Sequence, residues 1–244
     1  METIHTERVP PEYQEGFELL VRTLIELAGE NLLGVAAFGF WIVGDALPDD
    51  AATSVMVLER VDLELLDRLA EHGQALGAKR LRAPLVMTPA YIAESCDVFP
   101  LELLEIRQTQ RIVYGEDFFS GCTFEPADVR LQAEREFKSE LIQLRQGLLA
   151  AAGRRKLLDP LARAGAARTL RILRGMLYLA GVEQVAERAA GLVVQAARTL
   201  EIKLPTLHDV VCGAEDLGFE GFRNFYGEIE ALAAHANRVV AGES

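Results

Sequence analysis

Residues 38–58 read FGFWIVGDALPDDAATSVMVL, and this stretch decides how the first half of the chain is interpreted. It begins at the end of a short apolar run, Leu32–Phe40, of the kind found in buried strands. The loop that follows contains two residues that interrupt regular structure, Gly44 and Pro48. Ser54–Leu58 (SVMVL) then predicts a second strand. The stretch is therefore interpreted as two strands joined by a loop.

Helical and strand-like segments alternate around this stretch. The spacing of apolar residues predicts helices over 12–27, 63–76 and 99–111, and further strands over 83–87 and 112–114. Asp62 is expected to cap the helix over 63–76, because a carboxylate accepts hydrogen bonds from the free N–H groups of a first helical turn. Gly77 is expected to end that helix.

The pattern changes near Pro126, after which nearly all of the chain is expected to be helical. Breaks at glycines and prolines separate the predicted helices, which cover residues 126–152, 160–180, 182–200, 207–213 and 219–240. The expected fold class is α+β. A domain with a small mixed β-sheet occupies residues 1–125, and an all-α helical bundle occupies residues 126–244.

The charge is unevenly distributed between these halves. Residues 1–125 contain 9 basic and 22 acidic side chains, a net charge of −13, whereas residues 126–244 contain 16 basic and 15 acidic side chains, a net charge of +1. Proteins bind nucleic acid largely by neutralising phosphates with basic side chains. The acidic first half therefore disfavours nucleic acid as a partner.

Cysteine usage and hydropathy narrow the class of protein further. The three cysteines, Cys96, Cys122 and Cys212, are odd in number and scattered, which does not fit a disulfide framework or a zinc site. No apolar run approaches the roughly 20 residues that cross a bilayer. We expect a cytoplasmic protein that does not associate with a membrane.

The segment over 38–58 resembles the signature of the polymerase-beta-like nucleotidyltransferase superfamily. In that signature Gly-Ser ends one strand, a loop follows, and the next strand carries Asp-x-Asp. Aligned without gaps, Gly39 matches the motif glycine, and Gly44-Asp45 and Pro48-Asp49 match the Gly-Asp and Pro-Asp that are usual in the loop. IVYGED, residues 112–117, resembles the valine-leucine-tyrosine-glycine strand of the small bacterial members. The resemblance covers residues 15–118, and helical bundles are often attached to this fold.

The aligned positions lack the acids that the resemblance requires for activity. Nucleotidyl transfer uses Mg²⁺ ions, and carboxylates at positions i and i+2 of a strand point the same way and bridge two of them. Ala51 and Thr53 occupy these two positions, and the third carboxylate would fall near Pro84. Phe40 replaces the motif serine, and Val43 stands where the family often has a basic residue. The resemblance therefore implies the fold without a catalytic set or a metal site.

A shift of register does not restore the pair of acids. Asp45, Asp49, Asp50 and Glu59 are the acids within residues 45–60, and no two of them are separated by one residue. Neighbouring residues of a strand face opposite sides of the sheet, so Asp49 and Asp50 do not form the pair. Asp62 and Glu64 have the right spacing, but they stand at the predicted helix start.

Other catalytic motifs are absent from the sequence. The histidines, His5, His72, His208 and His235, have no acid or cysteine at metal-ligand spacing. GxSxG, GxxxxGK[ST] and GxGxxG do not occur. A group of arginines in the second half is the remaining candidate for an anion contact: Arg163, Arg168, Arg171 and Arg174 fall within about 140° of one helix face. These arginines either bind the phosphates of a ligand, or they form a solvated helix face or pair with acids of the first domain.

Three hypotheses follow. In the first, to which we give most weight, the chain keeps the nucleotidyltransferase fold, has no catalytic residues or cofactor, and acts as a regulatory or interaction module. Its partner would be another protein or a second copy of the chain, and it would bind nucleotide weakly at most. The nucleotide-contacting residues would be Gly39, Phe40, Trp41, Gly44, Asp45, Asp49 and Asp50.

The second hypothesis is an active Mg²⁺-dependent nucleotidyltransferase, acting on a small molecule or a protein, whose acids come from Asp45, Asp49 or Asp50. The third is a protein that binds a small anionic ligand between the two domains, with the four arginines as contacts.

Overall fold

The structure is a computed structural model that describes residues 3–43 and 51–239. The polypeptide packs into two compact units. The first consists of Met1–Cys96 and Glu105–Thr123, and the second of Asp97–Leu104 and Phe124–Ser244. The sequence places the domain boundary between residues 125 and 126. Residues 97–104 come before that boundary but belong to the second unit, with the helices that follow residue 124.

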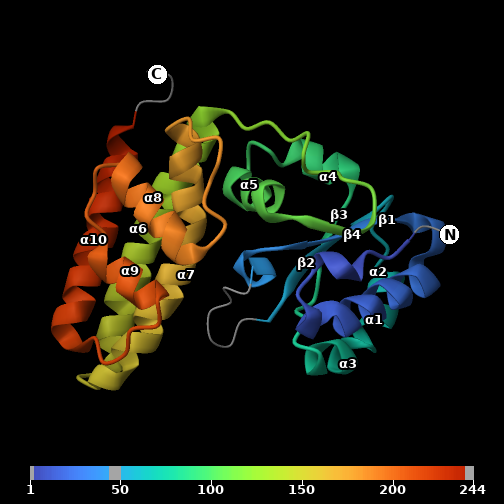
Figure 1. Ribbon diagram of the computed structural model, residues 1–244, viewed down its shortest axis with the longest axis horizontal. Coiled ribbons are helices and arrows are strands. Elements are labelled where there is room, and N and C mark those ends of the chain that lie inside the picture. The colour runs from blue at the N-terminus through green and yellow to red at the C-terminus, as the bar shows by residue number, and fades with distance from the viewer. Residues whose placement is uncertain (1–2, 44–50, 240–244) are drawn as a thin grey trace. The chain divides into compact units, whose positions relative to one another are not determined.

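A mixed four-stranded sheet forms the centre of the first unit (Figure 1). Its strands are β1 (Leu32–Phe38), β2 (Thr53–Leu58), β3 (Leu85–Met87) and β4 (Arg111–Gly115). They are ordered β3-β2-β1-β4, with β1 antiparallel to β2 and β4 and with β2 parallel to β3. The described sheet and the helices after it confirm the predicted α+β class.

Three helices, α1 (Pro11–Ala28), α2 (Leu63–Ala70) and α3 (Gly73–Ala78), lie on one face of this sheet (Figure 1). Alternate residues of the strands turn the same way, so Val35 and Ala37 of β1 and Met56 and Leu58 of β2 line that face. They pack against the apolar stripe of α1, which supplies Phe17, Leu20, Val21 and Leu24. The helix predicted over residues 12–27 is thus confirmed, and its apolar face packs against the sheet.

The helix predicted over residues 63–76 is wrong as one element. Asp62 caps α2 as expected, because its Oδ1 accepts the N–H of Glu64 at 2.9 Å. However, α2 ends at Ala70, and a tight turn in which the N–H of His72 bonds to the Leu69 carbonyl precedes α3. The apolar spacing continues through the break, and so the pattern did not reveal it.

Two short helices follow β3. The sequence-based prediction missed α4 (Pro89–Glu94), although Thr88 and Pro89 are residues typical of a helix start. The hydroxyl of Thr88 accepts the N–H of Tyr91 at 3.1 Å. Helix α5 (Pro100–Thr109) begins in the second unit, where Gln132 Oε1 accepts the N–H of Leu101 at 2.9 Å.

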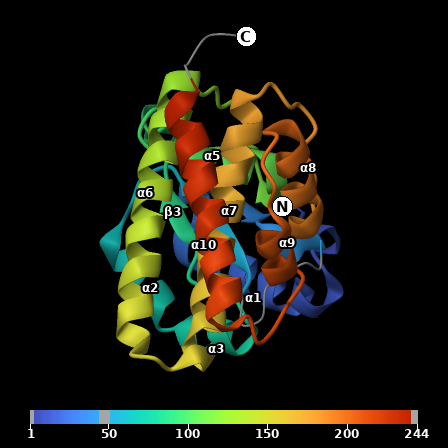
Figure 2. The same cartoon turned by 90° about the vertical axis from the view of Figure 1, so that its left-hand side faces the viewer.

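The second unit contains α6 (Pro126–Ala151), α7 (Leu158–Leu179), α8 (Ala189–Thr199), α9 (Pro205–Val211) and α10 (Gly218–Arg238). Figure 2 shows α6, α10 and α7 running along one another. The helix predicted over residues 182–200 is too long, since α8 begins at Ala189. The side chain of Gln195 accepts the N–H of Ala186 and donates to the carbonyl of Gln184, both at 2.8 Å, and so it holds residues 184–186 in an irregular path.

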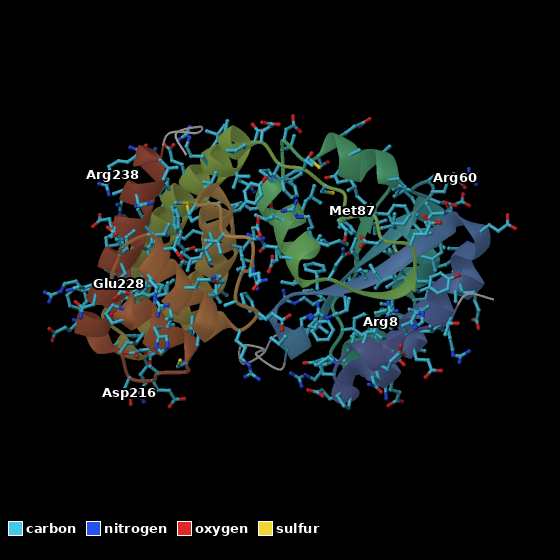
Figure 3. All side chains as sticks on the ribbon, turned by 45° about the horizontal axis from the view of Figure 1, so that its top comes forward. Arg8, Arg60, Met87, Asp216, Glu228 and Arg238 are labelled. Atoms are coloured by element: carbon cyan, nitrogen blue, oxygen red, sulfur yellow. The ribbon has the colours of Figure 1, made fainter. Side chains whose placement is uncertain are left out.

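Glu228 of α10, labelled in Figure 3, holds the start of α9 in place. Its two carboxylate oxygens accept the N–H groups of Thr206 and Leu207 at 2.8 and 2.7 Å. Burial raises the pKa of Glu228, while these two hydrogen bonds oppose the shift. Within the described residues, no helix is long and apolar enough to cross a membrane, and Cys96, Cys122 and Cys212 are free thiols.

Gly115, at the end of β4, is required by the geometry of the sheet. Its φ is +69°, and a Cβ built there would lie 2.1 Å from the carbonyl oxygen of Leu33 on β1. Such a distance forces the backbone of one strand to move. The glycine of the IVYGED segment therefore lets β4 approach β1.

We expect Gly115→Ala to lower the free energy of unfolding of the first unit by about 3 kcal/mol, because it combines strain at positive φ with the clash against Leu33. Urea unfolding followed by the fluorescence of Trp41, the single tryptophan, measures the loss. Gly121→Ala is the matched control, because its Cβ would meet no atom within 4 Å. Equal stability of the two variants would contradict this account of β4.

Candidate functional site

The end of β1 and the start of β2 hold the residues that carry the resemblance. Phe38 and Thr53 are partners in the β1–β2 register, so Gly39 and the first residues of β2 lie side by side. Gly39 has a φ of +104°, a conformation that side-chain-bearing residues rarely adopt. The chain turns there into a short 3₁₀ helix, Phe40–Val43.

A hydrogen-bond network occupies this point of the sheet. The Thr53 hydroxyl donates to the carbonyl oxygen of Phe38 at 2.6 Å and accepts from the indole Nε1 of Trp41 at 3.2 Å. The same indole N–H also donates to the Phe38 carbonyl at 2.7 Å. Thr53, which stands where the signature has its second acid, thus uses its hydroxyl to join β2 to the end of β1.

Trp41 belongs to the core of the first unit. It is 4% exposed and contacts two aromatic residues of α1. Its ring is stacked 5.5 Å from that of Phe17 and meets Tyr13 edge-on at 4.8 Å. Such pairs contribute about 0.5–1.5 kcal/mol beyond the area they bury. Phe40, by contrast, is half-buried.

The backbone N–H of Gly39 is engaged as well. It donates to the hydroxyl of Thr109, at the end of α5, at 3.0 Å, and that hydroxyl donates to the carbonyl oxygen of Glu105 at 2.8 Å. Sequence reasoning missed Thr109. No local pattern could have identified it, because the bond to Gly39 spans 70 residues.

The described residues at this point do not fit a magnesium ion. Mg²⁺ is held by carboxylates and other oxygen ligands in octahedral geometry. Ala51 offers a methyl group, the Thr53 hydroxyl is engaged as above, and Pro84 precedes β3, whose Leu85 pairs with Val55. Across residues 3–43 and 51–239, no group of three or more histidine, cysteine, aspartate or glutamate side chains is placed to hold a metal.

Four of the predicted nucleotide contacts lie outside the described residues. They are Gly44, Asp45, Asp49 and Asp50. The roles assigned to them, and to Gly39, Phe40 and Trp41, stay predictions.

Two of the four α7 arginines, Arg168 and Arg171, bind acids of the second unit. Arg168 binds the carboxylate of Glu140 through Nε and through Nη2, the latter at 3.1 Å, and Glu140 is only 1% exposed. Arg171 lies 3.5 Å from Glu102 and 3.3 Å from Glu136. Arg174 is 1% exposed, and Arg163 is half-buried. These four side chains therefore do not share one solvent-exposed face, and their role as anion contacts stays a prediction.

Among known proteins, a solved structure is similar to this chain in fold. No protein-family model and no curated protein matches the sequence. A crystal structure of spectinomycin adenyltransferase AAD(9) from Enterococcus faecialis, determined with ATP and spectinomycin, is similar with a TM-score of 0.57. The similarity covers 92% of this chain and 99% of that chain, at 10% sequence identity. This chain has the nucleotidyltransferase fold.

We expect Thr53→Val to lower the free energy of unfolding of this nucleotidyltransferase-fold unit by about 1–2 kcal/mol. Valine has the same shape but lacks the hydroxyl that bonds to Phe38 and Trp41. Denaturant unfolding followed by Trp41 fluorescence measures the change. Thr53→Ser keeps the hydroxyl and should lose less. If the serine variant were the weaker of the two, the methyl group rather than the hydroxyl would be the important contact.

We expect Arg168→Met to destabilise the helical unit by about 3 kcal/mol, because it leaves the buried Glu140 carboxylate without its cation. Thermal unfolding followed by circular dichroism tests this. Adding Glu140→Leu to the same chain should recover most of the loss, since the buried charge is then gone. Arg223→Met, which breaks an exposed pair with Glu220 at 3.6 Å on α10, is the control and should cost less than about 1 kcal/mol. A small effect of Arg168→Met would point to a role other than neutralising Glu140.

Proposed function

We propose that this nucleotidyltransferase-fold chain is a non-catalytic module that acts through a protein partner and binds nucleotides weakly at most. The observation that carries the proposal is that Thr53, at the position of the second signature acid, and Trp41, two residues after the motif glycine, hold the end of β1. We also expect it to act in the cytoplasm of a bacterium.

The absence of paired acids on β2 is the first support. Metal ions in such transferases stabilise the charge on the transferred phosphoryl group, which contributes several kcal/mol, and each ~1.4 kcal/mol changes a rate about tenfold. A methyl group at Ala51 cannot ligate Mg²⁺. The Thr53 hydroxyl is committed to Phe38 and Trp41.

The engaged backbone at Gly39 is the second support. Backbone N–H groups in glycine-containing loops bind phosphates when they are available to donate. The Gly39 N–H donates to Thr109 instead, so a phosphate would have to displace that bond. Phe40 replaces the small hydroxyl residue of the signature with an apolar ring. Both features predict weak nucleotide binding.

The two remaining hypotheses are outcomes of the same experiment. ATP and spectinomycin are named for the adenyltransferase of similar fold, which makes nucleotides the first ligands to test here. An active transferase would depend on Asp45, Asp49 or Asp50. A protein that binds a small anion would bind triphosphate through the α7 arginines, whether or not Mg²⁺ is present.

Titration calorimetry with ATP, GTP, CTP and UTP, each with and without Mg²⁺, tests the proposal. We expect dissociation constants above about 1 mM and no strengthening by Mg²⁺, because the described residues provide no metal ligands at the motif. Incubation with labelled nucleotide and Mg²⁺ should transfer no label to the chain or to small hydroxyl-containing acceptors.

The triple variant Asp45→Asn, Asp49→Asn, Asp50→Asn is the matched control. Binding or transfer that requires Mg²⁺ and disappears in this variant would replace the proposal with an active transferase. Tight binding that ignores Mg²⁺ and is lost in Arg163→Gln would favour the anion-binding hypothesis.

A further inference from the structure

Helix α6 carries three large apolar side chains on its exposed surface. Leu131 is 47% exposed, Ile142 is 52% exposed and Leu149 is 79% exposed. Their spacings of 11 and 7 residues place them within about 20° of one another around the helix axis, at 100° per residue. They form one line about 27 Å long, at 1.5 Å per residue.

Cationic side chains flank this line on both sides. Arg135 lies about 40° to one side, and Lys138 and Arg145 lie about 20° and 40° to the other, at the same 100° per residue. All three are exposed. Taken together the six positions, 131, 135, 138, 142, 145 and 149, repeat at alternating spacings of four and three residues, which is the spacing of a helix–helix seam. We call these six residues the α6 stripe.

The three apolar side chains of the α6 stripe are exposed and lie outside the face of α6 that packs the bundle. The buried residues of that other face include Val129, Ala133, Phe137, Leu141 and Leu144. Of the three cations, Arg145 also reaches α10, where it donates to the hydroxyl of Tyr226 at 2.7 Å. Figure 2 shows α6 at one side of the bundle, with α10 and α7 along its inner side. Helix α6 therefore carries a second, narrower line of apolar side chains besides the face that packs the bundle.

We propose that the α6 stripe is the docking surface for an acidic amphipathic helix of a partner protein. The apolar residues of such a helix would pack against Leu131, Ile142 and Leu149, and its flanking carboxylates would lie beside the cations. Within this chain Lys138 pairs with Glu134, and Arg145 donates to the Tyr226 hydroxyl at 2.7 Å and lies 3.9 Å from Glu230. Because these contacts already offset the charges of Lys138 and Arg145, reversing the charge of Arg135 should affect partner binding most.

The charges of the α6 stripe argue against pairing with a second copy of itself. In an antiparallel pair centred on the stripe, Arg135 faces Arg145. In a parallel pair each cation faces its own copy. Like charges directly opposite one another are unfavourable, and charged residues at seam positions restrict which helices can pair. The stripe thus selects a partner of opposite charge.

This inference rests on the proposed role as an interaction module and names the chemistry of its partner. The two can fail separately, because nucleotide binding is measured at the β1–β2 site and partner binding at α6. Activity at the nucleotide site would overturn the proposed function without touching the α6 stripe.

Fluorescence anisotropy with a synthetic peptide tests the inference. The probe is a helical peptide of roughly 21 residues, three heptads, with Leu at the two seam positions and Glu at the flanking positions. A second peptide carries Lys in place of every Glu. We expect the full-length chain to bind the Glu peptide at least tenfold more tightly than the Lys peptide, and the binding to weaken as salt rises.

Variants locate the binding on α6. Ile142→Glu should weaken binding of the Glu peptide at least tenfold, whereas Val194→Glu, at a residue of α8 that is 47% exposed, should leave it unchanged. Arg135→Glu with Lys138→Glu should reverse the preference toward the Lys peptide. Circular dichroism and thermal unfolding confirm that each variant is folded, as expected for exposed positions.

Three results would overturn the proposal. They are no binding of the Glu peptide, equal binding of both peptides, and binding that Ile142→Glu leaves intact. Sedimentation of the chain with vesicles of anionic lipid, if abolished by Ile142→Glu, would assign the stripe to a membrane surface instead. Self-association abolished by the same variant would assign it to a second copy.

Discussion

The indole of Trp41 joins three elements of the first unit at one point. Its ring packs on Phe17 and Tyr13 of α1, and its N–H donates to the Phe38 carbonyl at the end of β1. The hydroxyl of Thr53 on β2 bonds to both the indole and that carbonyl. The turn after β1, the start of β2 and the cover of the sheet therefore depend on one another, because moving the ring would break packing and hydrogen bonds together.

This arrangement does not suit a metal-binding carboxylate at residue 53. A carboxylate in place of the Thr53 hydroxyl would face the carbonyl oxygen of Phe38, and two acceptors cannot share a hydrogen bond. Partial burial would add the cost of removing the charge from water. Residue 53, where the signature has its second acid, instead holds a hydroxyl that joins β2 to the end of β1, which is the physical basis for proposing a non-catalytic role.

Local sequence signals predicted the elements that local interactions determine. The apolar stripe of α1, the Asp62 cap and the glycine at the end of β4 were all evident in the sequence, and the structure contains each of them. Other features left no periodic pattern in the sequence. The bond from Gly39 to Thr109 joins residues 70 positions apart, while the turn between α2 and α3 and the late start of α8 under Gln195 depend on single local hydrogen bonds. The acids that bind Arg168 and Arg171 could not be identified from the sequence either, since Glu140, Glu102 and Glu136 lie on other helices.

The exposed line on α6 requires a different explanation from the β1–β2 site. The fold accounts for Trp41 and Thr53, because both are held by contacts within the first unit. It does not account for Ile142 or Leu149, whose exposure to water brings the bundle no packing. Scattered exposed apolar residues are common, but three in one line with cations on both sides match the geometry of a helix partner. In a chain with a net charge of −12, a cationic stripe on one helix also orients the approach of an acidic partner toward that helix.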